Sequence, residues 1–153
     1  MSKIVIIYDS KTGNTEKMAE AIAEGARSVE DTEVVIRKVG EAFSLSELGI
    51  ADAVILGSPA HYANLTSEMR VILESIEKLS GFGKIDLRGK VGAAFGSYGW
   101  DGGWSIEKIF REFMGRVGMK VTQPILLSIG APNSEVLEKC RELGKRVAGD
   151  VKR

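Results

Sequence analysis

A polar loop near the N-terminus carries residue types that bind phosphate groups. It lies between an apolar run, residues 4–8, and an amphipathic segment that begins at Thr15. Hydroxyl groups can donate hydrogen bonds, Gly13 lets the backbone approach a ligand, and a helix start adds free N–H groups and a favourable dipole. This first loop predicts a phosphate site without a metal, although an ordinary capped turn has a similar composition. Its residues are Ser10, Lys11, Thr12, Gly13, Asn14 and Thr15.

Two later loops carry aromatic side chains among glycine and proline. The middle loop follows an apolar run at residues 53–57 and holds the only histidine of the chain. The third loop follows residues 91–96, and there Trp100 is the first candidate to stack on a planar ring, with Tyr98 second. Alone, the middle loop also fits an ordinary connection, and Trp104 fits a core residue that packs a helix. The candidate residues are Ser58, Pro59, Ala60, His61, Tyr62 and Asn64 in the middle loop, and Ser97, Tyr98, Gly99, Trp100, Asp101, Gly102 and Gly103 in the third.

Short apolar runs alternate along the chain with longer amphipathic segments. Continuous apolar runs indicate strands buried on both faces, and a stripe such as Met18, Ile22 and Ala26 indicates a helix. Small residues in the fourth run predict close packing against it, and Pro124 places the fifth run at a sheet edge. The alternation predicts a doubly wound α/β fold, with a five-stranded parallel sheet in the order 2-1-3-4-5. We expect strands at residues 4–8, 32–39, 53–57, 91–96 and 119–129, helices at 15–28, 66–79, 104–117 and 133–151, and a less clear helical turn at 44–50.

In that strand order the three loops meet at one edge of the sheet. Strands 1, 3 and 4 are neighbours, and such sheets bind ligands outside the carboxyl ends of their strands, where the strand order reverses. The first loop follows strand 1, and the two aromatic loops follow strands 3 and 4. A phosphate group at one end and a planar ring at the other describe flavin mononucleotide, FMN.

These residues resemble the flavodoxin-like FMN-binding superfamily over essentially the whole chain. Residues 10–15 match the family's FMN-phosphate motif, Ser/Thr-x-Thr-Gly-x-Thr, at each fixed position. Residues 8–10, 96–103 and 130–132 most resemble the flavodoxin domain of flavodiiron proteins, where a separate metallo-β-lactamase-like domain holds the two irons. The resemblance implies a three-layer flavodoxin-like fold, FMN as cofactor and electron transfer, with residues 1–153 forming the flavin domain alone.

The middle loop is similar to a different branch of the superfamily. Residues 57–65 resemble the pattern Gly-Thr/Ser-Pro-x-Arg-Phe/Tyr-Gly-Asn-Met of flavodoxin-like NAD(P)H:quinone oxidoreductases, with His61 in place of the arginine. Those enzymes are longer and differ in the third loop. Electron-transfer flavodoxins, in turn, tend to be strongly acidic, which this chain is not. The resemblance therefore supports an electron carrier first and an NAD(P)H-dependent FMN reductase or quinone oxidoreductase as the alternative.

Composition excludes several other classes. The 153 residues include one histidine and one cysteine, which excludes an intrachain disulfide and argues against a zinc or di-iron site. Equal numbers of basic and acidic side chains, 21 each, argue against a nucleic-acid-binding domain. No apolar run approaches the roughly 20 residues of a membrane span, and no signal-peptide pattern is evident. We expect one cytoplasmic domain, with Cys140 packed on an apolar helix stripe.

The leading hypothesis is an FMN-dependent carrier whose electron donor and acceptor are separate redox partner proteins. Lys11 either offsets phosphate charge or points to solvent. Asp101 lowers the flavin potential if it lies near the ring, and is otherwise a solvated turn residue. His61 could tune the potential by titrating near neutral pH. Exposed Tyr62 and Trp100 could also seat a second copy of the chain, forming a homo-oligomer.

Overall fold

A parallel β-sheet forms the middle layer of the protein, and the computed structural model describes residues 1–99 and 102–152. The strand order β2-β1-β3-β4-β5 confirms the predicted topology, with β6 also pairing with β4. The strands are β1 (Ser2–Tyr8), β2 (Thr32–Lys38), β3 (Ala53–Pro59), β4 (Val91–Tyr98), β5 (Lys120–Val121) and β6 (Leu126–Ile129). The helices are α1 (Asn14–Arg27), α2 (Ser67–Gly81), α3 (Gly103–Arg116), α4 (Ser134–Val151) and the short 3-10 helix η1 (Leu45–Ile50).

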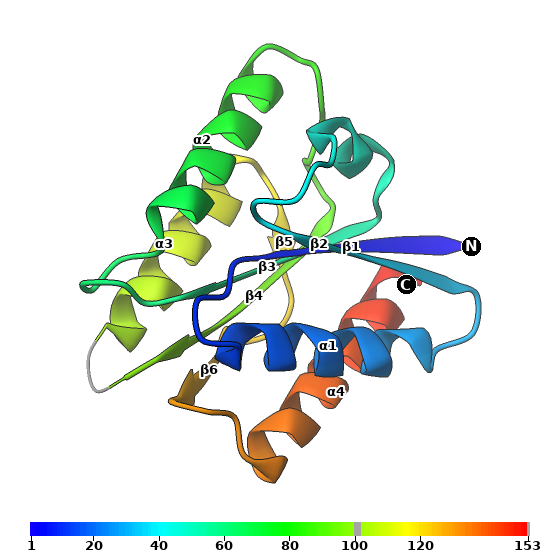
Figure 1. Cartoon of the computed structure of the whole chain (residues 1–153). Helices are drawn as coiled ribbons and strands as arrows, with labels where there is room; N and C mark the ends of the chain where they lie inside the picture. The colour runs from blue at the N-terminus through cyan, green and yellow to red at the C-terminus, as the bar shows by residue number, and fades with distance from the viewer. Residues whose placement is uncertain (100–101, 153) are drawn as a thin grey trace.

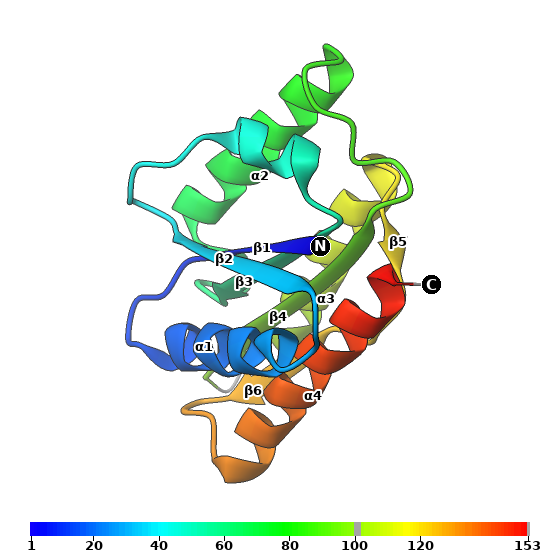
Figure 2. The same ribbon diagram turned by 90° about the vertical axis from the view of Figure 1, so that its right-hand side faces the viewer.

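Helices cover both faces of the sheet, with α1 and α4 on one side and α2 and α3 on the other (Figures 1 and 2). Successive side chains of a strand point to opposite faces, so β1 feeds both cores. Ile4 and Ile6 join the core under α1 and α4, whereas Val5 and Ile7 join the core under α2 and α3. Cys140 is fully buried in the first of these cores, which confirms its predicted packing role. Within the described residues, no helix is both long and apolar enough to cross a membrane.

Small residues of β4 let α3 lie close to the sheet, as the sequence predicts. A Cβ atom added to Gly92 would lie 2.9 Å from Met114 Sδ, and one added to Gly96 would lie 2.9 Å from Ile106 Cγ2. A Cβ at Gly92 would displace the Met114 side chain, and one at Gly96 would crowd both Ile106 of α3 and Ser58 O, which would lie at 2.5 Å. The start of α3 is thereby held beside the end of β4, where the third loop connects them.

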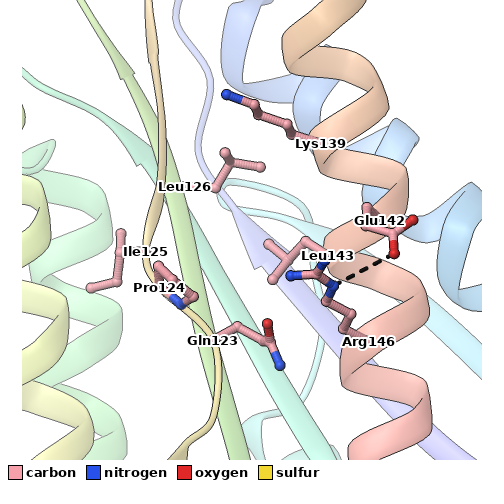
Figure 3. Close-up of a pocket in the computed structure, with 8 residues that line it drawn as sticks. All are labelled: Gln123, Pro124, Ile125, Leu126, Lys139, Glu142, Leu143 and Arg146. Carbon is pink, nitrogen blue, oxygen red and sulfur yellow. Dashed lines mark ion pairs between the residues drawn. The ribbon is translucent and has the colours of Figure 1, made fainter.

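The predicted fifth strand region, residues 119–129, which Pro124 interrupts, is divided into two short strands, β5 and β6. Between two paired positions β4 advances from Val91 to Phe95, while the edge strand advances from Lys120 to Leu126. The edge strand thus holds two extra residues in this interval, and Pro124 within it has no N–H to give to the ladder. Beside this bulge, a hollow of about 330 Å³ lies against α4, where Arg146 Nε pairs with Glu142 at 3.5 Å (Figure 3).

Trp104 does not belong to the core, which corrects the interpretation of it as a helix-packing residue. Its side chain is 64% exposed in the first turn of α3. The inward side of α3 is formed by Ile106, Phe110 and Phe113, which follow one another at helical spacing. Residues two apart on a helix face different directions, so a tryptophan two positions before Ile106 points outward.

Candidate functional site: a cleft at the carboxyl edge of the sheet

The three loops meet where β1, β3 and β4 end, beside the start of α1 (Figure 1), and they enclose a cavity of about 360 Å³. Residues of all three loops line this cavity, so the loops meet at one edge of the sheet as predicted. Gly130, which follows β6, also lines the cavity and is absent from the predicted site, although its segment was singled out by the resemblance. Trp100 and Asp101 lie outside the described residues. The predicted residues in the lining are Lys11, Thr12 and Asn14, then Pro59, Ala60 and His61, then Ser97, Tyr98 and Gly99.

The first loop is closed by its own serine. Ser10 Oγ accepts hydrogen bonds from the backbone N–H groups of Gly13, at 3.1 Å, and Glu16, at 3.3 Å. Gly13 adopts the left-handed conformation, with φ of 93°, which directs the chain into α1 and favours glycine at this position. Two N–H groups at the start of α1 therefore converge on one oxygen atom. A phosphate oxygen is a stronger acceptor than a hydroxyl, so this arrangement fits an FMN phosphate.

A buried acid, Asp9, supports the first loop and was missed by the sequence reasoning. Its side chain accepts a hydrogen bond from the backbone N–H of Ser10 at 2.9 Å and one from Thr66 Oγ1 at 2.6 Å. Lys11 Nζ lies 3.6 Å from the same carboxylate and 2.5 Å from Glu68 Oε2. Hydrogen bonding to Glu68 raises the pKa of Lys11, and the same contact lowers the pKa of Glu68 to about 2.

A buried hydrogen bond joins the first loop to the third. Thr15 Oγ1 and Ser97 Oγ lie 2.9 Å apart, and these residues are only 1% and 4% exposed. Each hydroxyl can donate once, so one of the two protons stays available to a further acceptor. Ser58, at the end of β3, is fully buried and donates to its neighbour's carbonyl, Pro59 O, at 2.9 Å.

The middle loop forms a tight hairpin, residues 60–65. Ala60 and Leu65 pair as an isolated antiparallel bridge, and His61 N–H donates to Asn64 O at 2.6 Å. The two residues at its tip, Tyr62 and Ala63, both have positive φ, 52° and 57°. Side chains with a Cβ atom resist this conformation, so the hairpin is strained. Tyr62 is 93% exposed, and its ring centroid lies 4.7 Å from that of His61.

Glycines of the third loop allow close contacts with both the hairpin and Tyr98. Gly102 has φ of 96°, and an added Cβ would lie 3.0 Å from Ala60 Cβ. A Cβ on Gly103 would lie 2.6 Å from the ring of Tyr98, so the half-buried tyrosine packs directly over this glycine. The hairpin, the start of α3 and Tyr98 thus support one another at the aromatic end of the cleft.

An α/β domain whose cleft joins a phosphate-type loop to an aromatic end has the architecture of an FMN-binding protein. A family model described as Flavodoxin matches residues 6–144. The flavodoxin of Aquifex aeolicus (strain VF5) is 39% identical over 97% of this chain and 86% of that protein. A flavodoxin structure from the domain Archaea, 34% identical, superposes with a TM-score of 0.87 over 99% of both chains. The chain belongs to the flavodoxin family.

Flavodoxins bind FMN and transfer electrons to partner proteins, so this chain is an FMN-binding electron carrier. The comparisons do not favour the alternative of an NAD(P)H-dependent reductase. The flavodiiron protein from Giardia intestinalis shares the fold, with a TM-score of 0.84 at 22% identity. This chain covers 36% of that protein, which supports the predicted resemblance to its flavin domain.

Proposed function

We propose that the cleft holds FMN with its phosphate in the first loop and its ring at the hairpin and third loop. The observation that carries this assignment is the cavity lined by all three loops, polar at one end and aromatic at the other. Trp100 and Asp101 are included because of their positions in the sequence of the third loop. The proposed contacts are Ser10, Lys11, Thr12, Gly13, Asn14, Thr15, Ser58, Pro59, Ala60, His61, Tyr62, Asn64, Ser97, Tyr98, Gly99, Trp100, Asp101, Gly102 and Gly103.

The bound flavin supplies the redox chemistry, and the chain binds it, orients it and sets its surroundings. The N–H groups of Gly13 and Glu16, now on Ser10 Oγ, are placed to hold a phosphate oxygen. The bond between Thr15 and Ser97 fixes the distance between the first and third loops. The orientation of the ring therefore follows from two constraints: the phosphate is held in the first loop, and the third loop is held at a fixed distance from it.

We propose that donor and acceptor proteins dock on an apolar rim formed by Tyr62, Trp104 and Ile129. These side chains are 93%, 64% and 70% exposed, on the hairpin, the start of α3 and the end of β6. Residues 58–66, 102–106 and 126–133 contain no Asp, Glu, Lys or Arg. Glu107 and Lys108 lie three and four residues after Trp104 on α3, so the uncharged rim has exposed neighbours of opposite charge. Exposed apolar groups in such a setting favour docking through buried surface rather than long-range attraction. A second copy on this rim and a cytoplasmic location stay predictions.

Binding of FMN tests the assignment of the cleft. Protein stripped of flavin is titrated with FMN and with riboflavin, which lacks the phosphate, and binding is followed by flavin fluorescence. We expect one FMN per chain and weaker binding of riboflavin. Absence of FMN binding would overturn the proposed cleft, and equal affinity for both flavins would remove the phosphate role of the first loop.

The apolar rim is tested with small redox probes of opposite charge. Reduced protein is reoxidised by anionic hexacyanoferrate(III) or cationic hexaammineruthenium(III) at about 0.02 M and about 0.5 M salt. We expect weak salt dependence with both probes, because the three rim side chains are uncharged and the neighbouring Glu107 and Lys108 have opposite charges. Strong salt effects of opposite sign would show a charged docking surface instead.

We propose that His61 makes the flavin potential depend on pH. It is the only histidine of the chain, and histidine is the residue type whose charge ordinarily changes near neutral pH. A cationic imidazole beside the ring would favour the reduced flavin. The midpoint potential of wild type and His61→Gln is measured from about pH 5.5 to about pH 8.5, on either side of the ordinary histidine pKa. Identical pH dependence in the two proteins would remove this role.

A further inference from the structure

A buried negative charge stands at the base of the first loop. Asp9 is 4% exposed, and its carboxylate accepts hydrogen bonds from the Ser10 N–H and from Thr66 Oγ1. Thr66 Oγ1 itself accepts from Met69 N–H at 3.2 Å, as the N-cap of α2. One carboxylate therefore ties the start of the first loop to the start of α2, across 57 positions of the chain.

That charge is unfavourable for a phosphate bound nearby. Ser10, whose hydroxyl gathers the N–H groups of the first loop, directly follows Asp9. Two negative groups close together in a partly buried site repel each other strongly. Among the described residues, the basic side chain paired with Asp9 is Lys11, which is also paired with Glu68. One ammonium group is thus shared between two carboxylates.

We propose that Asp9 is a positioning residue for the FMN phosphate, and that Lys11 is the counter-ion of Asp9 and Glu68 rather than a ligand of the phosphate. Neutral N–H and hydroxyl groups of the first loop then bind the phosphate. This inference rests on the proposed placement of the phosphate. For Lys11 the inference replaces the phosphate contact that its place in the first loop suggests. Although its side chain is 46% exposed, its ammonium group is paired with the carboxylates of both Asp9 and Glu68.

The proposal makes the effect of removing Lys11 depend on Asp9. In Lys11→Met, the carboxylate of Asp9 loses its counter-ion and repels the phosphate, so FMN affinity falls by roughly ten-fold. In the double variant with Asp9→Asn, that repulsion is gone, and the amide can still donate to Thr66 Oγ1 and accept from Ser10 N–H. FMN affinity then returns to within about three-fold of wild type. Riboflavin affinity stays constant throughout, because it has no phosphate.

The double-mutant cycle decides between the two roles of Lys11. If Lys11 binds the phosphate directly, its removal costs the same affinity in the wild-type background and in the Asp9→Asn background, and the proposal is overturned. If Asp9→Asn fails to fold, the salt dependence of Lys11→Met still decides. Raising salt from about 0.02 M to about 0.5 M should strengthen its FMN binding by screening repulsion, and weaker or unchanged binding contradicts the proposal.

A separate variant keeps Lys11 but removes one of its two carboxylate partners, Glu68. Glu68→Gln leaves one carboxylate beside the ammonium group, so FMN affinity should rise by about three-fold while riboflavin affinity stays the same. Glu74→Gln, an exposed glutamate further along α2, is the matched control and should change neither. An unchanged FMN affinity in Glu68→Gln contradicts the shared counter-ion. If the wild type binds no FMN, the proposed cleft fails, whereas binding with an additive cycle overturns only this inference.

Discussion

The two ends of the cleft are built in opposite ways. At the proposed phosphate end, the first loop is held by backbone N–H groups that donate to Ser10 Oγ and to the buried carboxylate of Asp9. At the proposed ring end, the hairpin carries strain at Tyr62 and Ala63 and presents exposed apolar surface. The first arrangement is suited to binding with little reorganisation, and the second to contact with changing partners. Affinity for FMN should therefore depend mainly on the phosphate end.

The test with the largest expected effect asks whether the sheet next to the ring end is tightly packed, in contrast to the strained hairpin above it. Gly57, at the end of β3, faces the ring of Phe95, and an added Cβ would lie 2.2 Å from it. Because both residues lie in the sheet, Gly57→Ala should lower the free energy of unfolding by about 1–3 kcal/mol, as overpacking does. Urea unfolding measures this. Gly81→Ala, where a Cβ meets nothing within 4 Å, should not lower stability and should raise it slightly, because unfolded alanine has less conformational entropy to lose. Equal losses of stability in Gly57→Ala and Gly81→Ala would contradict overpacking at Gly57.

A second test concerns the bond that joins the two ends. Thr15→Val removes the partner of the buried Ser97 hydroxyl while keeping the shape of the side chain. An unsatisfied buried hydroxyl costs about 1–3 kcal/mol, so both stability and FMN affinity should fall. Urea unfolding and FMN titration measure the two effects. Thr15→Ser keeps the hydroxyl and should retain most of the stability and most of the FMN affinity. Losses in Thr15→Ser as large as those in Thr15→Val would show that the methyl group matters instead.

Local sequence patterns predicted the strand order, the helices and the meeting of the three loops. The bond between Asp9 and Thr66 spans 57 positions and that between Thr15 and Ser97 spans 82, so no local spacing reveals them. The positive φ at Tyr62 had no sequence signal, because glycine and asparagine are the usual residues there. The prediction that Trp104 packs in the core is wrong because its position on α3 lies outside the inward stripe of Ile106, Phe110 and Phe113.

A third test removes backbone strain from the hairpin at the ring end. Ala63 has φ of 57°, which glycine adopts freely, so Ala63→Gly removes backbone strain. Left-handed strain of roughly 1–2 kcal/mol is partly offset by the greater entropy of unfolded glycine, leaving a gain of at most about 1 kcal/mol. Ala60→Gly, in the same hairpin but without positive φ, should instead lower stability. Urea unfolding compares them, and loss of stability in both variants would show that the tip is not strained.

The smallest effect expected is a pH dependence confined to the phosphate end. The contact with Lys11 lowers the pKa of Glu68 from 4.5 to about 2. A carboxyl group with a depressed pKa in the folded state stabilises the fold fully above its unfolded pKa, and loses that contribution as the pH falls through the folded value. Wild type should therefore lose more stability than Glu68→Gln between about pH 4.5 and pH 2, by a small amount because the pair is exposed.

Urea midpoints across this acid range measure the difference. The ring-end variant Ala63→Gly alters no charged group, so its acid dependence should follow wild type. Parallel acid dependence in wild type and Glu68→Gln would show that the ion pair between Lys11 and Glu68 contributes nothing measurable to stability.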